Sequence, residues 1–361
     1  MKELLYIASS SGHILSFHVP YILEFKRLGW EVHVAFGGVD TVITGADRSI
    51  ALPIEKRYIS VNNIKACSVL HRLMAEQEYD LVIPHTSLAS FYTRLAEIGL
   101  KNRPETIIVV HGYLFGPHAG LLKNLVLEAA EYMMLPQTDC IVTMNEWDMQ
   151  WVKKHFPHKK QRFIHGMGVD ANRYGDMHRS GSAESGHNDF VMAYAAEFSN
   201  RKNQQFLINA MGRLPENIRL ILPGTGDNLD ICRKLADENG VSDRVIIPGY
   251  VEDIGSVLAS ADAAVTSSHS EGLPFNVMEA MLAGLPVVAS DVKGNNDLVK
   301  DGINGFLYPD GDTDAFVSAV MKLYSDSTLC SRMGDQGMII MEQYKLDAVL
   351  PEVMDVYLDR L

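Results

Sequence analysis

Short apolar runs alternate with longer amphipathic segments throughout the first half of the chain. A short apolar run bounded by polar residues or glycine is typical of a buried strand, and an amphipathic segment is typical of a helix. The predicted strands lie at residues 4–8, 31–36, 80–84 and 106–110. Residues 17–28 are predicted as a helix that ends at Gly29. Strands that alternate with helices indicate a parallel sheet covered on both faces.

The same alternation returns in the second half of the chain. Strands are predicted at residues 190–196, 219–223, 244–247, 262–266 and 285–289. Helices are predicted between them at residues 204–214 and 229–239, with Gly240 ending the second. This set predicts a second Rossmann-like unit.

A polar segment at residues 175–189 separates the two sets and has the Gly, Ser, His and Asn content of a linker. We place the domain boundary between about residues 167 and 189. The expected fold is therefore α/β, with Rossmann-like parallel-sheet domains at 1–167 and 168–342 that face each other across a cleft. We expect the last helix, at about 343–361, to pack back on the first domain.

Composition supports a globular chain with more than one domain. The length of 361 residues exceeds one ordinary α/β core, and apolar residues make up 47% of the chain. No apolar run approaches the roughly 18 residues of a membrane-spanning helix, and we expect a cytoplasmic location. The four cysteines form no CxxC pair, which indicates neither a disulfide framework nor a zinc site.

Charge is distributed unevenly along the chain. Residues 1–165 hold 17 lysines and arginines against 16 acidic residues, a net charge of +1, whereas residues 166–361 hold 15 against 29, a net charge of −14. The total of −13 argues against nucleic acid as a partner, because nucleic-acid binding needs a basic surface. An anionic surface would more readily meet the first half.

The strongest chemical signal is the segment from Glu271 to Glu279, with the sequence EGLPFNVME. Pro274 suits the first turn of a helix and Gly284 its end, which places Glu271 in the preceding loop and Glu279 on the second turn. The N–H groups around residues 275–277 would then form an anion site suited to phosphate. Carboxylates accept paired sugar hydroxyls, so the pattern favours a sugar nucleotide. The alternative is an ordinary helix with a capping and a solvated glutamate.

Three weaker signals follow predicted strands. Arg201 and Lys202 suit a diphosphate, by bidentate contact and by point charge, and the alternative is a solvated basic pair. Gly12 lies in the segment SSSGH, where the backbone can approach a phosphate, although no GxGxxG motif is present. His111 could bond a sugar hydroxyl, or it could be a core or capping histidine.

One literal metal motif is better explained by helix capping. The segments Asp310–Asp312 and Asp312–Asp314 match the DxD pattern, but both precede an apparent helix at residues 315–324. We therefore expect no metal ligands in the site. The chain also lacks the GxxxxGK[ST], HExxH and GxSxG motifs.

The segment from Glu271 to Glu279 resembles the E-x7-E motif of retaining GT-B glycosyltransferases of family 4, also called group 1. The similarity extends over nearly the full chain and includes HG at residues 111–112, GMGVD at 166–170, RKN at 201–203, GTG at 224–226, PGYV at 248–251 and DGING at 301–305. The stretches HGYLF at 111–115, MNE at 144–146 and VKGNNDL at 292–298 resemble the branch that makes bacterial capsule and exopolysaccharide.

The resemblance implies a catalytic group of four residues. Glu271 would contact the donor sugar and stabilise its developing positive charge. Arg201 and Lys202 would hold the diphosphate, and His111 would meet the donor sugar near the reacting carbon. Many family members carry the arginine about five residues before the lysine, where this chain has Glu197, so Arg201 would have to substitute for it.

The resemblance also implies a donor-binding set. Glu279 would bind ribose, and Tyr250 and Val251 would flank the base, expected to be uracil. Gly12 would contribute a backbone contact from the first domain. The complete implied set is Gly12, Gly224, Tyr250, Val251, Leu273, Pro274, Phe275, Asn276, Val277 and Glu279.

The implied activity is retaining transfer of a hexose or an N-acetylhexosamine from a UDP-sugar, with no metal or other cofactor required. We favour front-side displacement, in which the departing diphosphate accepts the proton of the acceptor. The expected acceptor is a saccharide linked to polyprenyl diphosphate, which would bring the enzyme to the inner face of the plasma membrane. Residues 151–162, basic with aromatics, would suit a membrane surface or form a solvated helix end.

Two other functions share these features. A GT-B-fold UDP-sugar epimerase would use the same nucleotide site, but the pattern from Glu271 to Glu279 favours a transferase. A non-catalytic sugar-nucleotide binder is disfavoured because the motif residues are complete. Conversion of a UDP-sugar to its epimer without any acceptor would identify the epimerase.

Overall fold

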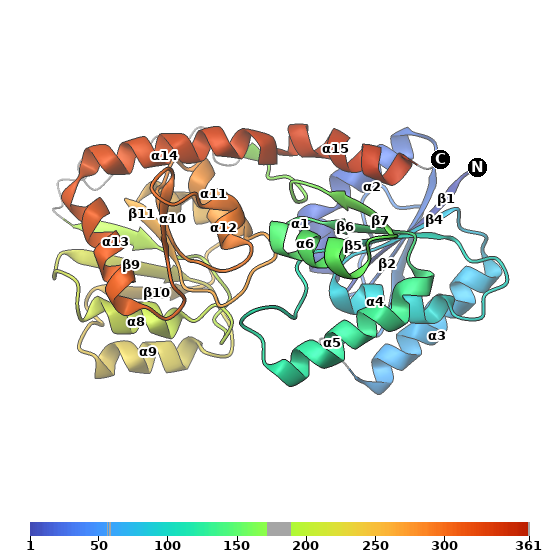
Figure 1. The fold of residues 1–361 in the computed structure, drawn as a ribbon, viewed down its shortest axis with the longest axis horizontal. Coiled ribbons are helices and arrows are strands. Elements are labelled where there is room, and N and C mark those ends of the chain that lie inside the picture. The colour runs from blue at the N-terminus through green and yellow to red at the C-terminus, as the bar shows by residue number, and fades with distance from the viewer. Residues whose placement is uncertain (56, 58, 172–188, 360–361) are drawn as a thin grey trace. The chain divides into compact units, whose positions relative to one another are not determined.

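The computed structural model describes residues 1–55, 57, 59–171 and 189–359, which form two compact units (Figure 1). Unit 1 comprises Met1–Gly168 with Asp347–Leu361, and unit 2 comprises Val169–Leu346. The linker predicted at residues 175–189 lies, except for Asp189, outside the described residues. No described helix is both long enough and apolar enough to cross a membrane.

Unit 1 is built on a parallel sheet of seven described strands in the order β3-β2-β1-β4-β5-β6-β7. Their bounds are β1 Glu3–Ala8, β2 Glu31–Phe36, β3 Arg48–Ala51, β4 Leu81–Pro84, β5 Glu105–Val110, β6 Cys140–Thr143 and β7 Lys160–Phe163. The helices are α1 Ser11–Phe17, α2 Val19–Arg27, α3 Val61–Glu76, α4 Ser87–Glu97, α5 Leu121–Met134, α6 Glu146–His155 and the short 3-10 turn η1 Leu135–Gln137. Helices α3, α4 and α5 lie on one side of this sheet, and α2 and α15 on the other (Figure 1).

Unit 2 has a parallel sheet of six described strands in the order β10-β9-β8-β11-β12-β13. Their bounds are β8 Phe190–Ala193, β9 Ile218–Pro223, β10 Val245–Gly249, β11 Ala263–Thr266, β12 Val287–Ser290 and β13 Gly305–Tyr308. The helices are α8 Gln204–Met211, α9 Leu229–Glu238, α10 Ile254–Ala259, α11 Phe275–Leu282, α12 Asn295–Leu298, α13 Thr313–Ser325, α14 Ser327–Met341 and the 3-10 turn η3 Glu342–Tyr344. The apolar side chains of β8, β9 and β11 pack against α8, α9 and α13 as one core.

Every predicted strand is present, and the α/β class with two parallel sheets is confirmed. The helix predicted at 17–28 is wrong in its start. The chain forms α1 and then α2, because His18 has φ −115° and ψ −13° and α2 begins anew with Pro20 in its first turn. A missing N–H group is tolerated in a first turn, where it would have no partner within the helix.

The last helix, α15 (Leu346–Leu358), belongs to unit 1 from Asp347 onward. Its side chains Val349, Val353 and Tyr357 are fully buried. The ring of Tyr357 stacks on Phe25 of α2 at 6.1 Å between centroids. The core of unit 1 is therefore completed by a segment remote in sequence from its sheet.

Candidate functional site

A buried cluster of three charges lies in unit 2, in the loops that follow β8 and β11. The Nη1 atom of Arg201 donates to Oε2 of Glu271 at 2.6 Å, and Nζ of Lys202 donates to Oε1 of Glu271 at 2.6 Å. Glu271 is 7% exposed and Lys202 is 9% exposed, whereas the Arg201 side chain keeps 45% of its surface exposed. The sequence predicted that these residues share a site, but not that both cations bond to one carboxylate.

The backbone of the Arg201–Lys202 loop is held by hydroxyl groups of neighbouring strands. Tyr194 donates to the carbonyl oxygen of Lys202 at 3.2 Å, and Ser267 donates to the same oxygen at 3.0 Å. The backbone N–H of His269 donates to the carbonyl oxygen of Arg201 at 2.9 Å. These bonds join the loop of Arg201 and Lys202 to the loop that leads to Glu271. The hydrogen-bonded backbone of these loops therefore fixes the positions of the three charged side chains.

The ionisation of the cluster follows from burial opposed by pairing. Burial raises the pKa of Glu271, but Lys202 and Arg201 outweigh it and hold the pKa below its usual range. Burial lowers the pKa of Lys202, and Glu271 opposes this shift. For Arg201, burial lowers the pKa, but pairing with Glu271 outweighs it and leaves the pKa above its ordinary value. With all three groups charged, the cluster carries a net charge of +1 and suits an anion.

Helix α11 begins one residue later than the sequence predicted. Pro274 is its N-cap with φ −76° and ψ 112°, and Gly284 follows the C-cap residue Ala283 with φ +72°. Glu279 lies on the second turn, as predicted, and is half-buried. The expectation that the Val277 amide is free for an anion is wrong, because it donates to the carbonyl oxygen of Pro274 at 3.1 Å.

Close backbone packing explains two glycines near the cluster. A Cβ atom on Gly294 would lie 2.7 Å from Cβ of Glu271, and Gly294 has φ +84°. A Cβ atom on Gly224 would lie 2.0 Å from the carbonyl oxygen of Ala196 in the loop after β8. Both positions therefore require glycine if the loops that carry the charges are to stay in place.

The remaining donor-binding positions have a range of exposures. Tyr250, directly after β10, is 77% exposed, and Val251 beside it is half-buried. An exposed aromatic ring at a strand end is suited to stacking on a base, and this role stays a prediction. Within the segment that leads into α11, Leu273 and Pro274 are buried, and Phe275 and Asn276 are half-buried.

Unit 1 brings four histidines together at the carboxyl ends of β1, β4 and β5. Nε2 of His18 lies 2.8 Å from Nδ1 of His13, and Nδ1 of His85 lies 2.9 Å from Nε2 of His111. The hydroxyl of Tyr6 lies 2.9 Å from Nδ1 of His18. The sequence predicted only His111 of these four. His13 and His85 could have been found by collecting the histidines that follow predicted strands, whereas His18 lies in the helix predicted at residues 17–28.

Gly12 lies in the first turn of α1 and not in the predicted loop. Ser10 caps this helix by accepting from the N–H of His13 at 3.2 Å. A Cβ atom on Gly12 would meet nothing within 4 Å, so the residue leaves open space beside the helix start. Such a position permits a close approach by a ligand, and the predicted contact remains untested.

The predicted membrane segment at residues 151–162 is wrong in its aromatic part. Trp151 and Phe156 are 8% and 3% exposed and pack in the core of unit 1. Lys159 donates to the carbonyl oxygen of Thr138, and Lys160 pairs with Asp359. This segment therefore offers no aromatic surface to a membrane.

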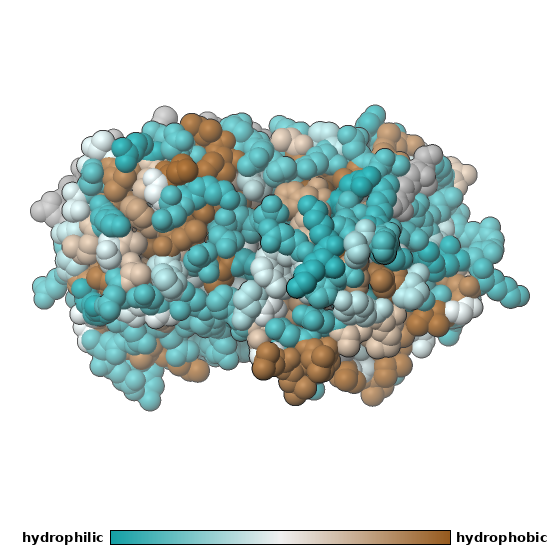
Figure 2. Space-filling model, viewed as in Figure 1, coloured by the Kyte–Doolittle hydropathy of each residue, from teal (hydrophilic) through white to brown (hydrophobic). Residues whose placement is uncertain are grey.

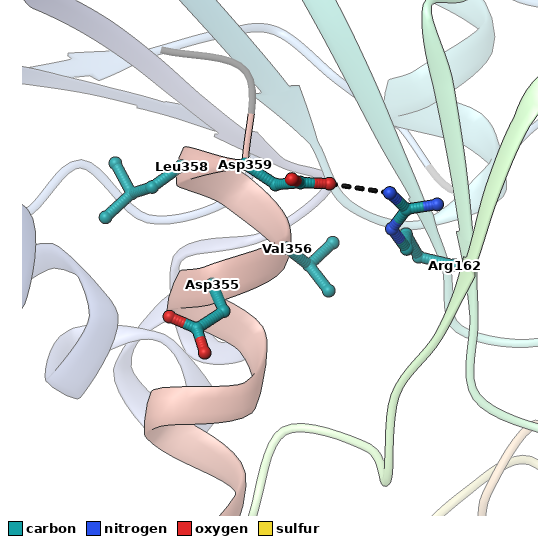
Figure 3. Close-up of a pocket in the computed structure, with 5 residues that line it drawn as sticks. All are labelled: Arg162, Asp355, Val356, Leu358 and Asp359. Atoms are coloured by element: carbon teal, nitrogen blue, oxygen red, sulfur yellow. Dashed lines mark hydrogen bonds and ion pairs between the residues drawn. The ribbon is translucent and has the colours of Figure 1, made fainter.

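Two other candidate features are accounted for by local structure. Asp312 caps α13 by accepting from the N–H of Ala315 at 2.9 Å, as the sequence predicted. A hollow beside α15 is lined by Arg162 and by residues of the helix, and Arg162 points to Asp359 across it (Figure 3). Bonds from Lys160 and Arg162 lower the pKa of Asp359 to about 2, so its carboxylate is ionised and already paired with these two cations.

Comparison with known proteins covers both units. The family described as "Glycosyltransferase Family 4" matches residues 22–173, and the family described as "Glycosyl transferases group 1" matches residues 180–338. The putative glycosyltransferase EpsD of Bacillus subtilis is 32% identical over 99% of this chain and 96% of its own. A galactosyltransferase of Escherichia coli, named for UDP-Gal and α-D-GlcNAc-diphosphoundecaprenol, is 24% identical over 86% of this chain and 84% of its own.

Solved structures show the same fold. The sucrose-phosphate synthase of Thermosynechococcus elongatus superposes with a TM-score of 0.81 at 18% identity over 99% of both chains. Anabaena HepE in complex with UDP-glucose superposes with a TM-score of 0.80 at 19% identity over the whole of both chains. The two relatives compared by sequence are named as glycosyltransferases and lend no support to the epimerase alternative. From these matches along the full length, the chain belongs to the group 1 glycosyltransferases of family 4, has the GT-B type of fold and is a transferase.

Proposed function

We propose that this transferase moves a hexose or an N-acetylhexosamine from a UDP-sugar to a lipid-linked saccharide, with retention of configuration and without a metal ion. The observation that carries the proposal is the buried cluster of Arg201, Lys202 and Glu271 at the carboxyl end of a parallel sheet. Ligands of open α/β sheets bind at this end of the strands. A uridine diphosphate group matches the cluster in charge and place.

The cluster provides two cations for one diphosphate. A nearby Arg and Lys can neutralise the charge that develops on the leaving diphosphate, as a divalent cation does in other enzymes. Glu271 holds both cations at 2.6 Å, so the two cations have a fixed orientation on one carboxylate. Ser268 is a third hydrogen-bond partner of the carboxylate, which leaves one acceptor position for a sugar hydroxyl. Glu271 would thus link the diphosphate cations to the donor sugar.

The proposed donor and acceptor draw support from the relatives. The Escherichia coli relative is named for UDP-Gal and for an undecaprenol diphosphate acceptor, and HepE is described with UDP-glucose. The similarity to EpsD supports a role in exopolysaccharide synthesis. Retention, front-side displacement and the contact of His111 with the donor sugar are predictions from the family pattern.

Nucleotide release from a panel of UDP- and GDP-sugars tests the proposal. We expect UDP release that requires a polyprenyl-diphosphate-linked saccharide, persists in EDTA and yields a product with the anomeric configuration of the donor by NMR. Release only from GDP-sugars, loss of activity in EDTA, or inversion would each contradict one part. An epimer formed without acceptor would replace the proposal by the epimerase.

Substitution of the carboxylate tests the role of the cluster. Glu271→Gln is expected to lower kcat by about 10²–10³-fold, because the lost charge acts chiefly on the transition state. UDP affinity should change much less. Glu216→Gln, an exposed glutamate of the same unit, is the matched control. Equal losses of kcat and UDP affinity would argue for a purely structural role.

A lipid-linked acceptor requires the enzyme to reach a membrane, and α5 offers a surface for this contact. Five apolar residues on its outward face are between 58% and 90% exposed: Leu121, Leu122, Leu125, Val126 and Met133. They recur at helical spacing and form one apolar stripe. Figure 2 shows an apolar patch over the start of this helix. We assign the stripe to a bilayer surface, where it takes the place of the buried aromatic residues Trp151 and Phe156.

The charge distribution agrees with a bilayer partner. The stripe lies in the half of the chain with a net charge of +1, and the exposed Lys123 interrupts it. At the far end of α5, Tyr132 bonds His155 of α6, where Lys153 and Lys154 are exposed. Apolar side chains flanked by lysines are typical of helices that lie on anionic membranes.

Flotation with vesicles that contain anionic lipid tests the surface. Leu121→Ser with Leu125→Ser is expected to weaken vesicle binding by about 100-fold, because each leucine that enters the bilayer contributes roughly 1.4 kcal/mol or more to the free energy of binding. Ile231→Ser with Ile339→Ser, exposed apolar residues on helices of unit 2, is the matched control. Unchanged binding in the first variant, or no binding by the wild type, would contradict the assignment.

A further inference from the structure

We propose that His13, His18 and His111 form a binding site for a transition-metal ion of the zinc type, and that the bound ion inhibits the transferase. The ligand nitrogens of these three side chains all lie within 4.8 Å of one another. Three imidazoles with an open fourth position are a recognised arrangement for zinc in proteins. The site shares no residue with the charge cluster of unit 2 and is formed wholly by residues of unit 1.

Metal binding requires a local rearrangement, in which the closest nitrogens separate and the widest pair closes by up to about 1.5 Å. Zinc binds histidine nitrogen at about 2.0–2.1 Å, so two ligand nitrogens on a tetrahedral ion stand about 3.3 Å apart. The closest pair, Nε2 of His18 and Nδ1 of His13, is at 2.8 Å. A metal ion would replace the hydrogen bond of this pair and move the two nitrogens apart by about half an ångström. His13 is in the first turn of the short helix α1, where such a shift is local.

The group is made of imidazole nitrogens. The described residues place no carboxylate in the group, which favours nitrogen-binding metals over magnesium or calcium.

Two of the three ligands have partners that orient them from behind. Nδ1 of His18 lies 2.9 Å from the Tyr6 hydroxyl, and donation to that oxygen leaves Nε2 for the metal. Nε2 of His111 lies 2.9 Å from Nδ1 of His85, and this contact holds the His111 ring in place. Bonds of this kind fix the tautomer and the ring direction of metal-binding histidines. Tyr6 and His85 are themselves fully buried, so both partners are rigid.

Access to the group is open on one side. His13 and His111 are partly exposed, whereas His18 is fully buried beneath them. An ion can therefore enter between the two outer rings and reach the inner one. Occupation would remove the imidazole of His111 from its proposed contact with the donor sugar. The inhibition rests on the proposed function, and the binding does not.

Isothermal titration of tag-free protein with zinc chloride tests the binding. We expect one ion per chain, with affinity lowered at least 10-fold in His13→Gln and unchanged in His158→Gln, an exposed histidine outside the group. His13→Cys offers a thiolate at the same position and is expected to retain binding. With cobalt in place of zinc, this variant should add a thiolate-to-metal absorption band. That band reports the ligand directly, whatever the activity.

The outcomes separate the parts of the proposal. Absence of zinc binding by the wild type, equal loss in His158→Gln, or a His13→Cys protein without the cobalt–thiolate band would overturn the site. Zinc is expected to reduce transfer in the wild type and to leave His13→Gln active. Zinc that binds at the site without slowing transfer would overturn the inhibition and the role of His111, while the metal site stands. An inactive wild type would contradict the proposed function and leave the titration unaffected.

Discussion

Acidification is expected to unfold unit 1 before unit 2, because unit 1 holds four imidazoles in their neutral form. Burial lowers the pKa of His13 to about 4. Burial, joined by repulsion from neighbouring imidazoles, lowers the pKa of His18, His85 and His111 well below the ordinary value. In the unfolded chain the same side chains titrate near pH 6.5. The unfolded state therefore binds more protons than the folded state at acid pH.

The sign and size of the effect follow from linkage. A histidine whose pKa is lowered by folding contributes no loss above pH 6.5 and destabilises the fold as the pH falls through that value. For His13, with pKa values of about 4 folded and about 6.5 unfolded, the loss between pH 7.5 and 5.5 is about 1.4 kcal/mol. Four such groups set a ceiling near 5.5 kcal/mol per pH unit. A domain is usually stable by about 5–15 kcal/mol, so this range of pH can unfold unit 1.

Tryptophan fluorescence isolates the effect, because Trp30, Trp147 and Trp151 all lie in unit 1. Urea unfolding at pH 7.5, 6.5 and 5.5 should show a midpoint that falls steeply with pH, while hydrogen exchange in unit 2 changes less. His13→Gln should reduce the pH dependence by about 1.4 kcal/mol over the same range. A tryptophan-detected midpoint that stays constant from pH 7.5 to 5.5, or an equal change in unit 2, would refute the reasoning.

Three further predictions concern single side chains. Glu271→Gln leaves Lys202 buried without its carboxylate and should lower the free energy of unfolding of unit 2, measured in urea, by about 3 kcal/mol. The double variant with Lys202→Met should recover most of this loss. Additive effects of the two substitutions would contradict an energetic coupling between Glu271 and Lys202. Gly294→Ala puts a Cβ atom 2.7 Å from Cβ of Glu271 and should reduce the transfer rate at least about 10-fold, with an unchanged circular dichroism spectrum. Full activity would show that the loop of Glu271 can shift to accommodate the added methyl group. The hydrogen bond to Glu352 raises the pKa of His165, so the contribution of this pair to the docking of α15 is present below pH 6.5 and is lost as the pH rises. Protection of α15 from hydrogen exchange should therefore weaken between pH 6 and 8 in the wild type but not in His165→Gln. Equal behaviour of the two proteins would exclude the pair as the cause.

The sequence analysis missed four of the described strands, β3, β6, β7 and β13, and two of these have few apolar side chains. Strands β3 and β7 lie at the two edges of the unit 1 sheet, and their residues are half-buried or exposed. The sequences RSIA and KQRF have no apolar run, so only pairing with β2 and β6 makes them strands. Most buried strands were predictable, because parallel strands covered on both faces must be apolar. The exceptions are β6 and β13, whose short apolar runs CIVT and GFLY were not predicted as strands.

The candidate site was predictable in its members more than in its contacts. Glu271, Arg201 and Lys202 stand out as charges beside predicted strand ends. Their shared hydrogen bonds join residues about 70 positions apart and depend on the loop geometry that Gly294 permits. The start of α11 was misjudged by one residue, because proline suits both the N-cap and the first turn, and this shift decides which amide is bonded.

The return of α15 to unit 1 has a consequence for the order of folding during synthesis. Unit 2 is continuous from Val169 to Leu346, so it can fold as soon as it leaves the ribosome. Unit 1 is translated first, yet its core lacks Val349, Val353 and Tyr357 until α15 has been made. The apolar face of the N-terminal sheet that α15 covers therefore stays exposed while about half of the polypeptide is synthesised. We accordingly expect unit 1, rather than unit 2, to depend on chaperones. On a ribosome stalled before α15 is made, unit 1 should be open to protease.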